Sequence, residues 1–410
     1  MHKFNAKYLI MKTVLSSTIL AAPFREEVKV QERQIPTYVY ASVFASLCIA
    51  VGLIWDISWH MTVGRDGLFS PPHIAIYLGA VIAGVFSGIK VLKTSFWGSP
   101  EEKASSIHFW KVFYGSFGAM FCIWGAFAML TSAPFDDWWH NTYGLDVKIL
   151  SPPHALLAMG MVMIQFGALV SVTSLQNRLS SQATEKTSSH LQWMYAMSAG
   201  FLLVMVFVII SEYFFLMRQH DILAYQIAAG VFPLLMVAVA YAAPYNWAAT
   251  KMAVAYTLLL AAMVWILPLF PAEPKLSPIR NFVTVMQPYE FPLMLIAPAL
   301  VIDFFLMKFG QINKWALAAL LGLGFVLVFL PVQWYFAEFL TTEAARGWFF
   351  GRFSWTYASD PDFPYRYTFH PRFISTGIDL IKGAGIAVII GLFSSRIALS
   401  WGNWMKRIKR

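Results

Sequence analysis

The sequence has little charge and almost no cysteine. Only 12% of its 410 residues are charged and 58% are apolar, whereas roughly a quarter of the residues of a soluble globular protein are charged. This composition excludes an ordinary soluble domain and predicts an integral membrane protein. The two cysteines, Cys48 and Cys122, lie within apolar runs, which excludes a disulfide scaffold, a structural zinc knuckle and an iron–sulfur cluster. Any metal ion would therefore be held by histidine and carboxylate side chains.

Acidic residues are outnumbered by basic ones, and the formal net charge is +9. In a soluble protein this surplus would suggest nucleic acid. Here the basic residues gather in short loops between apolar runs and at both chain ends, as the positive-inside rule describes. We therefore expect the protein to contact membrane lipid and to have no nucleic-acid partner. We also expect both termini to lie in the cytoplasm.

Runs of about 20 apolar residues, the length needed to cross roughly 30 Å of hydrocarbon, predict an all-α, polytopic bundle of about ten transmembrane helices. The predicted spans are 38–58, 73–92, 109–132, 154–175, 191–216, 222–242, 247–270, 290–307, 314–337 and 375–395.

The spans predict four parts of the chain. Residues 1–37 form a cytoplasmic N-terminal segment, and 38–175 form a four-helix region. Residues 176–190 are rich in Ser and Thr and form a polar linker. Residues 191–410 form a six-helix membrane region with a long outer loop at about 338–374.

One pattern in the first region occurs twice. Residues 55–79 read WDISWHMTVGRDGLFSPPHIAIYLG, and residues 135–160 read FDDWWHNTYGLDVKILSPPHALLAMG. Each copy contains Asp, then His four residues later with Trp before it, then Gly and Asp, and finally Ser-Pro-Pro-His. Such internal repetition indicates one structural unit used twice.

The spacing within each copy predicts a metal site. Asp and His four residues apart share one face of a helix. The Pro-Pro step begins the next helix and places the second His in its first turn, so that the connecting loop folds it back toward the first pair. Two imidazoles and one carboxylate form a three-ligand set with an open position, suited to copper, zinc or iron. The six predicted ligands are Asp56, His60, His73, Asp136, His140 and His154.

Further polar side chains are expected around these ligands. Asp66 and Asp146 could accept hydrogen bonds from ligating imidazoles, and Arg65 and Asp137 flank the same positions. Glu212, near the end of the predicted helix 191–216, could cap the metal site or belong to an ordinary surface turn.

Each feature alone has an ordinary explanation, since Trp residues line membrane interfaces and Pro often begins a helix. The joint pattern is harder to explain in this way, because four of the nine histidines fall in two copies of one motif. Ionisable groups at membrane depth are costly and are usually functional. The pattern therefore favours metal binding.

The two motifs resemble a known family. The first copy, Asp56-x3-His60-x12-His73 with Arg65-Asp66 and Phe-Ser-Pro-x-His, resembles the copper-site motif in the C subunit of particulate methane and ammonia monooxygenases. The second, Asp136-x3-His140-x13-His154, is similar to the other metal site of that subunit, where an Asn precedes two His at this spacing. The resemblance covers about residues 38–175.

The resemblance implies copper at both sites, with the catalytic residues at those sites. It implies an oxidoreductase, a monooxygenase that activates O2 and oxidises a small or lipophilic substrate with electrons from a quinol or similar donor. It also implies other monooxygenase-type subunits or a homo-oligomer. The chain departs from the family by Asp at position 136, by its greater length and by the lack of a soluble copper-binding domain.

Two other functions are compatible with the same residues. A copper-binding or copper-handling membrane protein would hold the ion without turnover, and a zinc-dependent membrane hydrolase would use metal-bound water with Asp66 or Asp146 as base. For localisation we expect a bacterial inner membrane, with the metal sites toward the periplasmic side.

Overall fold

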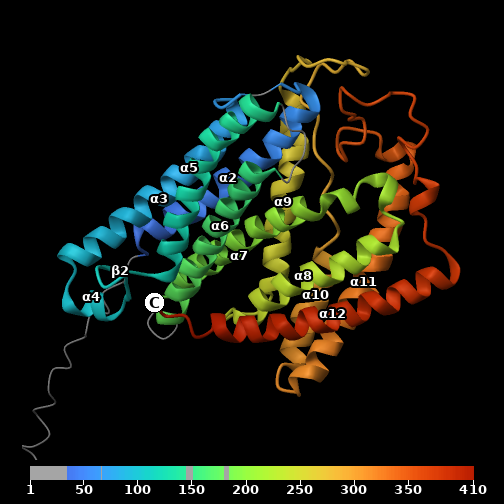
Figure 1. The fold of residues 1–410 in the computed structure, drawn as a ribbon. Helices are drawn as coiled ribbons and strands as arrows, with labels where there is room; N and C mark the ends of the chain where they lie inside the picture. Colours follow the sequence, from blue (N-terminus) through green and yellow to red (C-terminus); the bar gives the residue numbers. More distant parts are fainter. Residues whose placement is uncertain (1–34, 66, 145–150, 180–183) are drawn as a thin grey trace, which may run out of the picture. The chain divides into compact units, whose positions relative to one another are not determined.

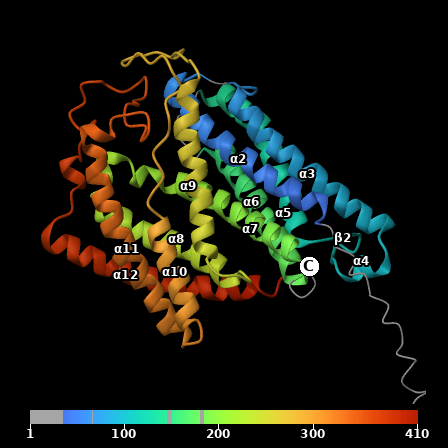
Figure 2. The same ribbon diagram turned by 180° about the vertical axis from the view of Figure 1, so that it is seen from behind.

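The computed structural model describes residues 35–65, 67–144, 151–179 and 184–410, and it confirms an all-α protein. Within these residues, nine helices are long and apolar enough to cross a membrane (Figures 1 and 2). These helices are α2 (Thr37–Thr62), α3 (Pro71–Trp97), α5 (Phe117–Tyr143), α6 (Pro152–Leu179), α7 (Glu185–Ile210), α8 (Ile222–Ala242), α9 (Ala248–Ile266), α11 (Lys314–Thr341) and α12 (Gly377–Met405).

The remaining elements are short. They are α4 (Pro100–Ala104), α10 (Ile296–Phe309), the antiparallel strands β1 (Ile107–Phe109) and β2 (Phe113–Gly115), and the 3-10 turns η1 (Ser211–Tyr213), η2 (Leu216–Arg218), η3 (Leu267–Leu269), η4 (Glu343–Ala345) and η5 (Pro371–Phe373).

The predicted span 290–307 differs from the structure. The helix found there, α10, has 14 residues and is about 21 Å long, less than the roughly 30 Å of a hydrocarbon core. Residues 286–294 before it are not helical and are mostly buried. Pro288 and Pro292 lie in this segment, and each proline removes a backbone N–H that a helix would use.

Polar side chains bind the backbone of this buried segment. The N–H of Gln287 donates to Thr62 Oγ1 at 2.8 Å, and its carbonyl accepts from Ser58 Oγ at 2.6 Å. The N–H of Met294 donates to Gln333 Oε1 at 2.9 Å. Non-helical backbone at membrane depth is tolerated where protein groups satisfy it in this way.

The predicted polar linker 176–190 is largely helical in the described residues. Helix α6 continues to Leu179 and α7 begins at Glu185, with the side chain of Thr184 accepting a hydrogen bond from the N–H of Thr187 at the start of α7. Of the predicted N-terminal segment, residues 1–34 lie outside the described residues.

The two copies of the motif form two helical hairpins that pack side by side, α2 with α3 and α5 with α6 (Figure 1). Small residues allow close approach at the same motif position in each. A Cβ atom on Gly79 would lie 2.9 Å from the Ala45 carbonyl oxygen, and one on Gly160 would lie 2.8 Å from that of Gly125. The two copies of the sequence motif thus use the same close helix–helix packing at equivalent glycines.

Segments from the C-terminal half pack against the loop that follows α2. The N–H of Tyr357 donates to the Met61 carbonyl at 3.1 Å, and the N–H of Lys275 donates to the Val63 carbonyl at 2.9 Å. The Tyr357 ring is buried against Gly64, whose φ of +76° suits glycine. Contacts with Lys275 and Tyr357 therefore fix the end of α2 and the start of the loop that follows it.

Candidate metal centre

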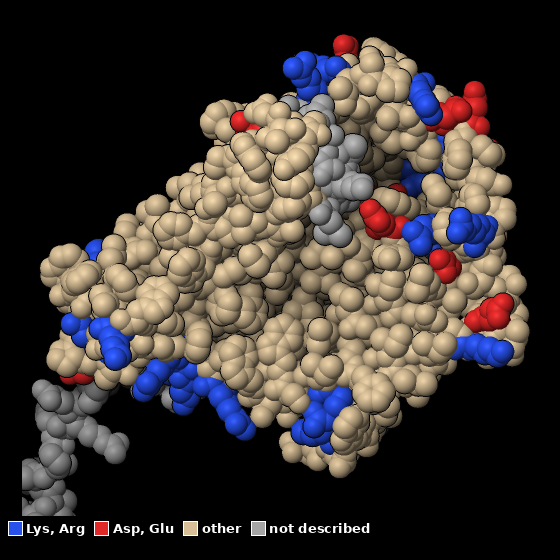
Figure 3. Space-filling model, viewed as in Figure 1, with Lys and Arg blue, Asp and Glu red and all other residues tan. Residues whose placement is uncertain are grey.

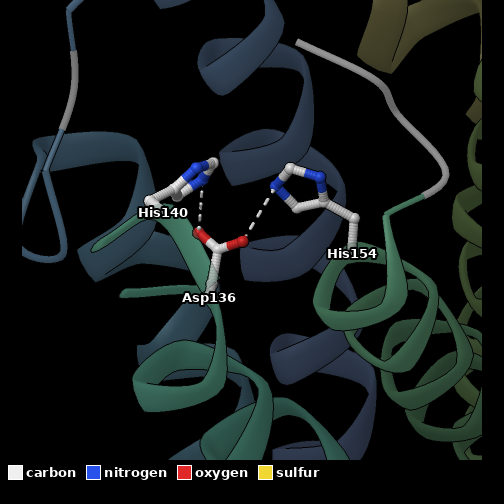
Figure 4. Close-up of side chains that lie close together, drawn as sticks. All are labelled: Asp136, His140 and His154. Carbon is white, nitrogen blue, oxygen red and sulfur yellow. Dashed lines mark ion pairs between the residues drawn. The ribbon is translucent and has the colours of Figure 1, made fainter. Parts of the chain in front are cut away.

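The second copy of the motif brings its three predicted ligands together (Figure 4). Asp136 and His140 lie one turn apart near the end of α5, and His154 lies in the first turn of α6. The Nε2 atoms of His140 and His154 are 3.3 and 3.4 Å from the Asp136 carboxylate oxygens. The three ligand atoms lie within 4.8 Å of one another, and no other group of three His, Cys, Asp or Glu ligands does so in the described residues.

Both imidazoles of this triad are held by their other nitrogen. The Nδ1 atom of His140 is 3.3 Å from the Gly144 carbonyl oxygen, and that of His154 is 2.9 Å from Ser151 Oγ. Gly144 has a φ of +87°, a conformation that glycine adopts without strain. Because a carbonyl oxygen can only accept, the Gly144 contact favours the His140 tautomer whose Nε2 lone pair is available to a metal ion, whereas the Ser151 hydroxyl can donate to or accept from His154 Nδ1.

The carboxylate of Asp136 also fits a metal ligand. Its Oδ1 atom is buried and accepts no hydrogen bond within the described part of the chain. A buried, unsatisfied carboxylate oxygen is costly, and a cation between the three groups would satisfy it. The imidazoles of His140 and His154 approach different oxygens of this carboxylate, Oδ2 and Oδ1, each at about the 3.4 Å that separates two ligands 2.1 Å from a tetrahedral ion.

The first copy is only partly assembled. The Nε2 atom of His73 is 3.2 Å from Asp56 Oδ1, and its Nδ1 atom is 3.0 Å from the Gly67 carbonyl oxygen. As in the second copy, this Oδ1 is buried without a hydrogen bond among the described residues. However, His60 is 49% exposed and its Nε2 is 3.8 Å from Asp56 Oδ2. The three ligand atoms of this copy do not come within 4.8 Å of one another.

Three further predicted residues lie outside these clusters. Arg65 is exposed, and its carbonyl oxygen accepts from Trp59 Nε1 at 3.1 Å. Asp137 is also exposed and accepts a hydrogen bond from Asn141. Glu212 lies exposed in η1, in the connection between α7 and α8. In the turn that follows Glu212, the carbonyls of Met217 and His220 accept backbone hydrogen bonds from His370 and Ser375, so this turn lies against the C-terminal segments.

Asp66 and Asp146, the predicted hydrogen-bonding partners of the ligands, lie outside the described residues. In the described residues, the Nδ1 partners are the carbonyls of Gly67 and Gly144 and the hydroxyl of Ser151. The sequence reasoning missed these partners. A signal for Ser151 was present, because this serine precedes the Pro-Pro step three residues before the histidine, within reach of its ring.

Comparison with known proteins gives no assignment. The chain matches no protein-family model, no curated protein and no solved structure. The functional assignment therefore rests on the site itself.

Proposed function

We propose that this chain is a membrane metalloprotein that holds a transition-metal ion with Asp136, His140 and His154. One observation carries the proposal: three ligand atoms from two helices lie within 4.8 Å of one another. The hydrogen bonds at both Nδ1 atoms and the unsatisfied Oδ1 of Asp136 support it.

We further propose that the ion is copper. Two imidazoles and one carboxylate suit copper, zinc or iron, and the resemblance of both motifs to copper-site motifs favours copper. Bound there, copper would supply O2 activation for the oxidation of a small or lipophilic substrate.

The residues of the second copy would bind the ion and present it to the membrane surface. The side chains of Asp136, His140 and His154 are 24–34% exposed, so a small molecule can approach the open coordination position. Beside them, Trp138 and Tyr143 are 51% and 66% exposed, with their rings 6.1 Å apart. These aromatic rings would attract an apolar substrate to the same end of the helices.

The first copy is proposed to bind a second ion more weakly. Asp56 and His73 provide two ligands 3.2 Å apart, and a side-chain movement of His60 would add the third. Two close ligands hold an ion less tightly than three, which predicts unequal affinities in the two copies.

We propose that the metal centre faces the periplasm of a bacterial inner membrane. His154 begins α6, whereas Asn177 near its other end binds the carbonyls of Met405 and Ile408 in the basic C-terminus. The basic end and the metal centre are thus separated by most of α6, about 35 Å. On the face drawn in Figure 3, a broad uncharged area lies between charged groups at the two ends of the helices.

The proposal is tested by metal analysis of the purified protein. We expect about one copper ion or more per chain, with a loss in His140→Ala. His190→Ala is the matched control, because His190 lies in the first turns of α7 and outside the triad. Copper-dependent O2 uptake with a quinol would support the oxygenase, whereas copper without O2 uptake would favour a copper-handling protein. Zinc with ester hydrolysis would favour the hydrolase, and absence of stoichiometric metal would contradict the whole proposal.

A further inference from the structure

A second polar site lies at the basic end of the molecule. Three chain segments meet there: the turn between α8 and α9, the turn between α10 and α11, and the end of α12. They line an open hollow of about 240 Å³. Its polar lining includes Tyr241, Asn246, Gln311, Lys314 and Lys406.

Two lysines in this hollow converge on one aromatic ring. Lys406 Nζ is 3.5 Å from the centre of the Tyr241 ring, and Lys314 Nζ is 4.8 Å from it. Lys314 Nζ also donates to the Gly310 carbonyl at 3.0 Å. The ring and the carbonyl attract the two ammonium groups but carry no formal charge to neutralise them.

The charge of these lysines is not balanced by a carboxylate. Within the described part of the chain, no carboxylate oxygen lies within 4.0 Å of either ammonium group. Asp303 lines the hollow, but its oxygens bind the start of α9, accepting from the N–H of Ala249 at 3.1 Å and of Thr250 at 2.8 Å. Two ammonium groups 3.5 and 4.8 Å from the centre of one ring, neither paired with a carboxylate in the described residues, favour the binding of an anion.

The surroundings indicate the kind of anion. Met307 and Trp247 line the same hollow and are 41% and 43% exposed, so apolar surface adjoins the cations, as at a lipid interface. The volume is below the roughly 300–1,000 Å³ of sites for drug-sized ligands, so it can hold a headgroup but not a whole lipid. Lysine binds phosphate well as a point charge, and the amides of Asn246 and Gln311 can donate hydrogen bonds.

We propose that this hollow binds a phosphate group, that of an anionic phospholipid headgroup or of a free phosphate ion, between Lys314 and Lys406. Basic pockets between membrane helices bind such headgroups on the cytoplasmic side. This site is separate from the metal centre, because the C-terminal residues next to Lys406 are bound by Asn177 at the far end of α6 from His154.

The test uses the full chain in detergent, titrated with short-chain phosphatidylglycerol, short-chain phosphatidylcholine and inorganic phosphate, while thermal unfolding is followed. We expect phosphatidylglycerol to raise the unfolding midpoint and phosphatidylcholine to leave it nearly unchanged. In Lys314→Gln/Lys406→Gln the affinity should fall on the order of thirtyfold, since each lysine near an anionic lipid contributes about a fivefold factor. A response to phosphatidylglycerol alone identifies the source as lipid, and an equal response to inorganic phosphate identifies it as the free ion.

Two further variants keep the result interpretable. Lys308→Gln/Lys409→Gln removes the same charge from neighbouring positions outside the hollow and should retain most of the effect. Lys406→Gln alone, at an exposed position after the last helix, should weaken binding about fivefold without disturbing the fold. Equal losses in the neighbouring pair, or undiminished binding in Lys314→Gln/Lys406→Gln, would overturn the proposal.

Discussion

The two copies of the motif share a scaffold but differ in how closely their ligands approach. Both place a carboxylate one turn before the first histidine, both direct the second histidine toward that carboxylate, and both leave its Oδ1 buried without a hydrogen bond in the described residues. Only the second copy brings all three ligand atoms within 4.8 Å. The Asp-x3-His spacing is the same in both copies and the spacing to the second histidine differs by one residue, x12 against x13, so similar motifs do not guarantee equal sites.

The contacts of the two loops differ at equivalent glycines. Gly64 in the first copy is covered by the Tyr357 ring, and its neighbours Met61 and Val63 accept hydrogen bonds from distant segments. In the second copy, a Cβ atom on Gly144 would meet no atom of the described residues within 4 Å. We infer that docking of the outer segments sets the loop of the first copy.

Removal of the ligand carboxylate should give the largest difference in metal affinity between the two copies. Asp136→Ala removes the carboxylate between the two imidazoles of the second copy. Loss of a ligand's hydrogen-bonding partner lowers metal affinity about tenfold to hundredfold. We expect loss of the ligand itself to lower the affinity of the tight site more than about a hundredfold. Asp56→Ala should leave this tight site intact. Metal titration of the two variants measures the difference. Equal losses would show that the copies form one shared site.

Substitution of the interhelical glycines should affect both copies alike. Gly79→Ala and Gly160→Ala each place a methyl group less than 3 Å from a carbonyl oxygen of the facing helix, and we expect each to cost about 1–3 kcal/mol of stability. Detergent unfolding of both variants checks this. A large effect at only one position would show that the two hairpins are not packed equivalently.

Substitution of the two loop glycines, Gly64 and Gly144, should reduce stability by different amounts. Gly64→Ala would strain a positive φ and also push against the buried Tyr357 ring, whereas Gly144→Ala would carry only the backbone strain of about 1–2 kcal/mol. We expect the larger loss of thermal stability in Gly64→Ala. In the double variant Gly64→Ala/Tyr357→Ala the new methyl group no longer meets the Tyr357 ring, so the additional loss of stability caused by Gly64→Ala should be smaller. If Gly144→Ala were the more damaging, the inference about docking would be wrong.

The serines before the Pro-Pro steps should show the smallest difference. Ser151→Ala removes the Nδ1 partner of His154 and should weaken metal binding about tenfold. Ser70→Ala should have no effect on metal binding, because Ser70 Oγ makes no hydrogen bond within the described residues. Competition with a metal chelator measures both affinities. A loss in Ser70→Ala equal to that in Ser151→Ala would argue against these roles.

Much of the fold was predictable because a membrane helix needs a long apolar run. The predicted span 222–242 coincides with α8, where the run has clear ends. The span 290–307 failed because apolar content does not distinguish a helix from buried extended chain. The backbone of that segment is satisfied by partners such as Thr62 and Gln333, which a local pattern cannot reveal.

The site was predictable as far as helix geometry determines it. The spacing of four residues and the Pro-Pro step correctly predicted that His73 and His154 would approach the carboxylates of Asp56 and Asp136. The exposed position of His60 was not predicted, and neither was the packing of Tyr357, almost 300 residues away, against Gly64 in the loop that follows. We infer that such tertiary contacts, together with the one-residue difference between the x12 and x13 spacings, decide which copy assembles three ligands.

The central claim is that two imidazoles of the second copy bind one metal ion together with Asp136. It is tested most directly by pulsed electron paramagnetic resonance of the protein loaded with one equivalent of Cu(II), which counts coordinated imidazoles. We predict two imidazoles in the wild type and in His73→Ala, and one in His154→Ala. A signal that loses an imidazole in His73→Ala but stays unchanged in His154→Ala would contradict the account.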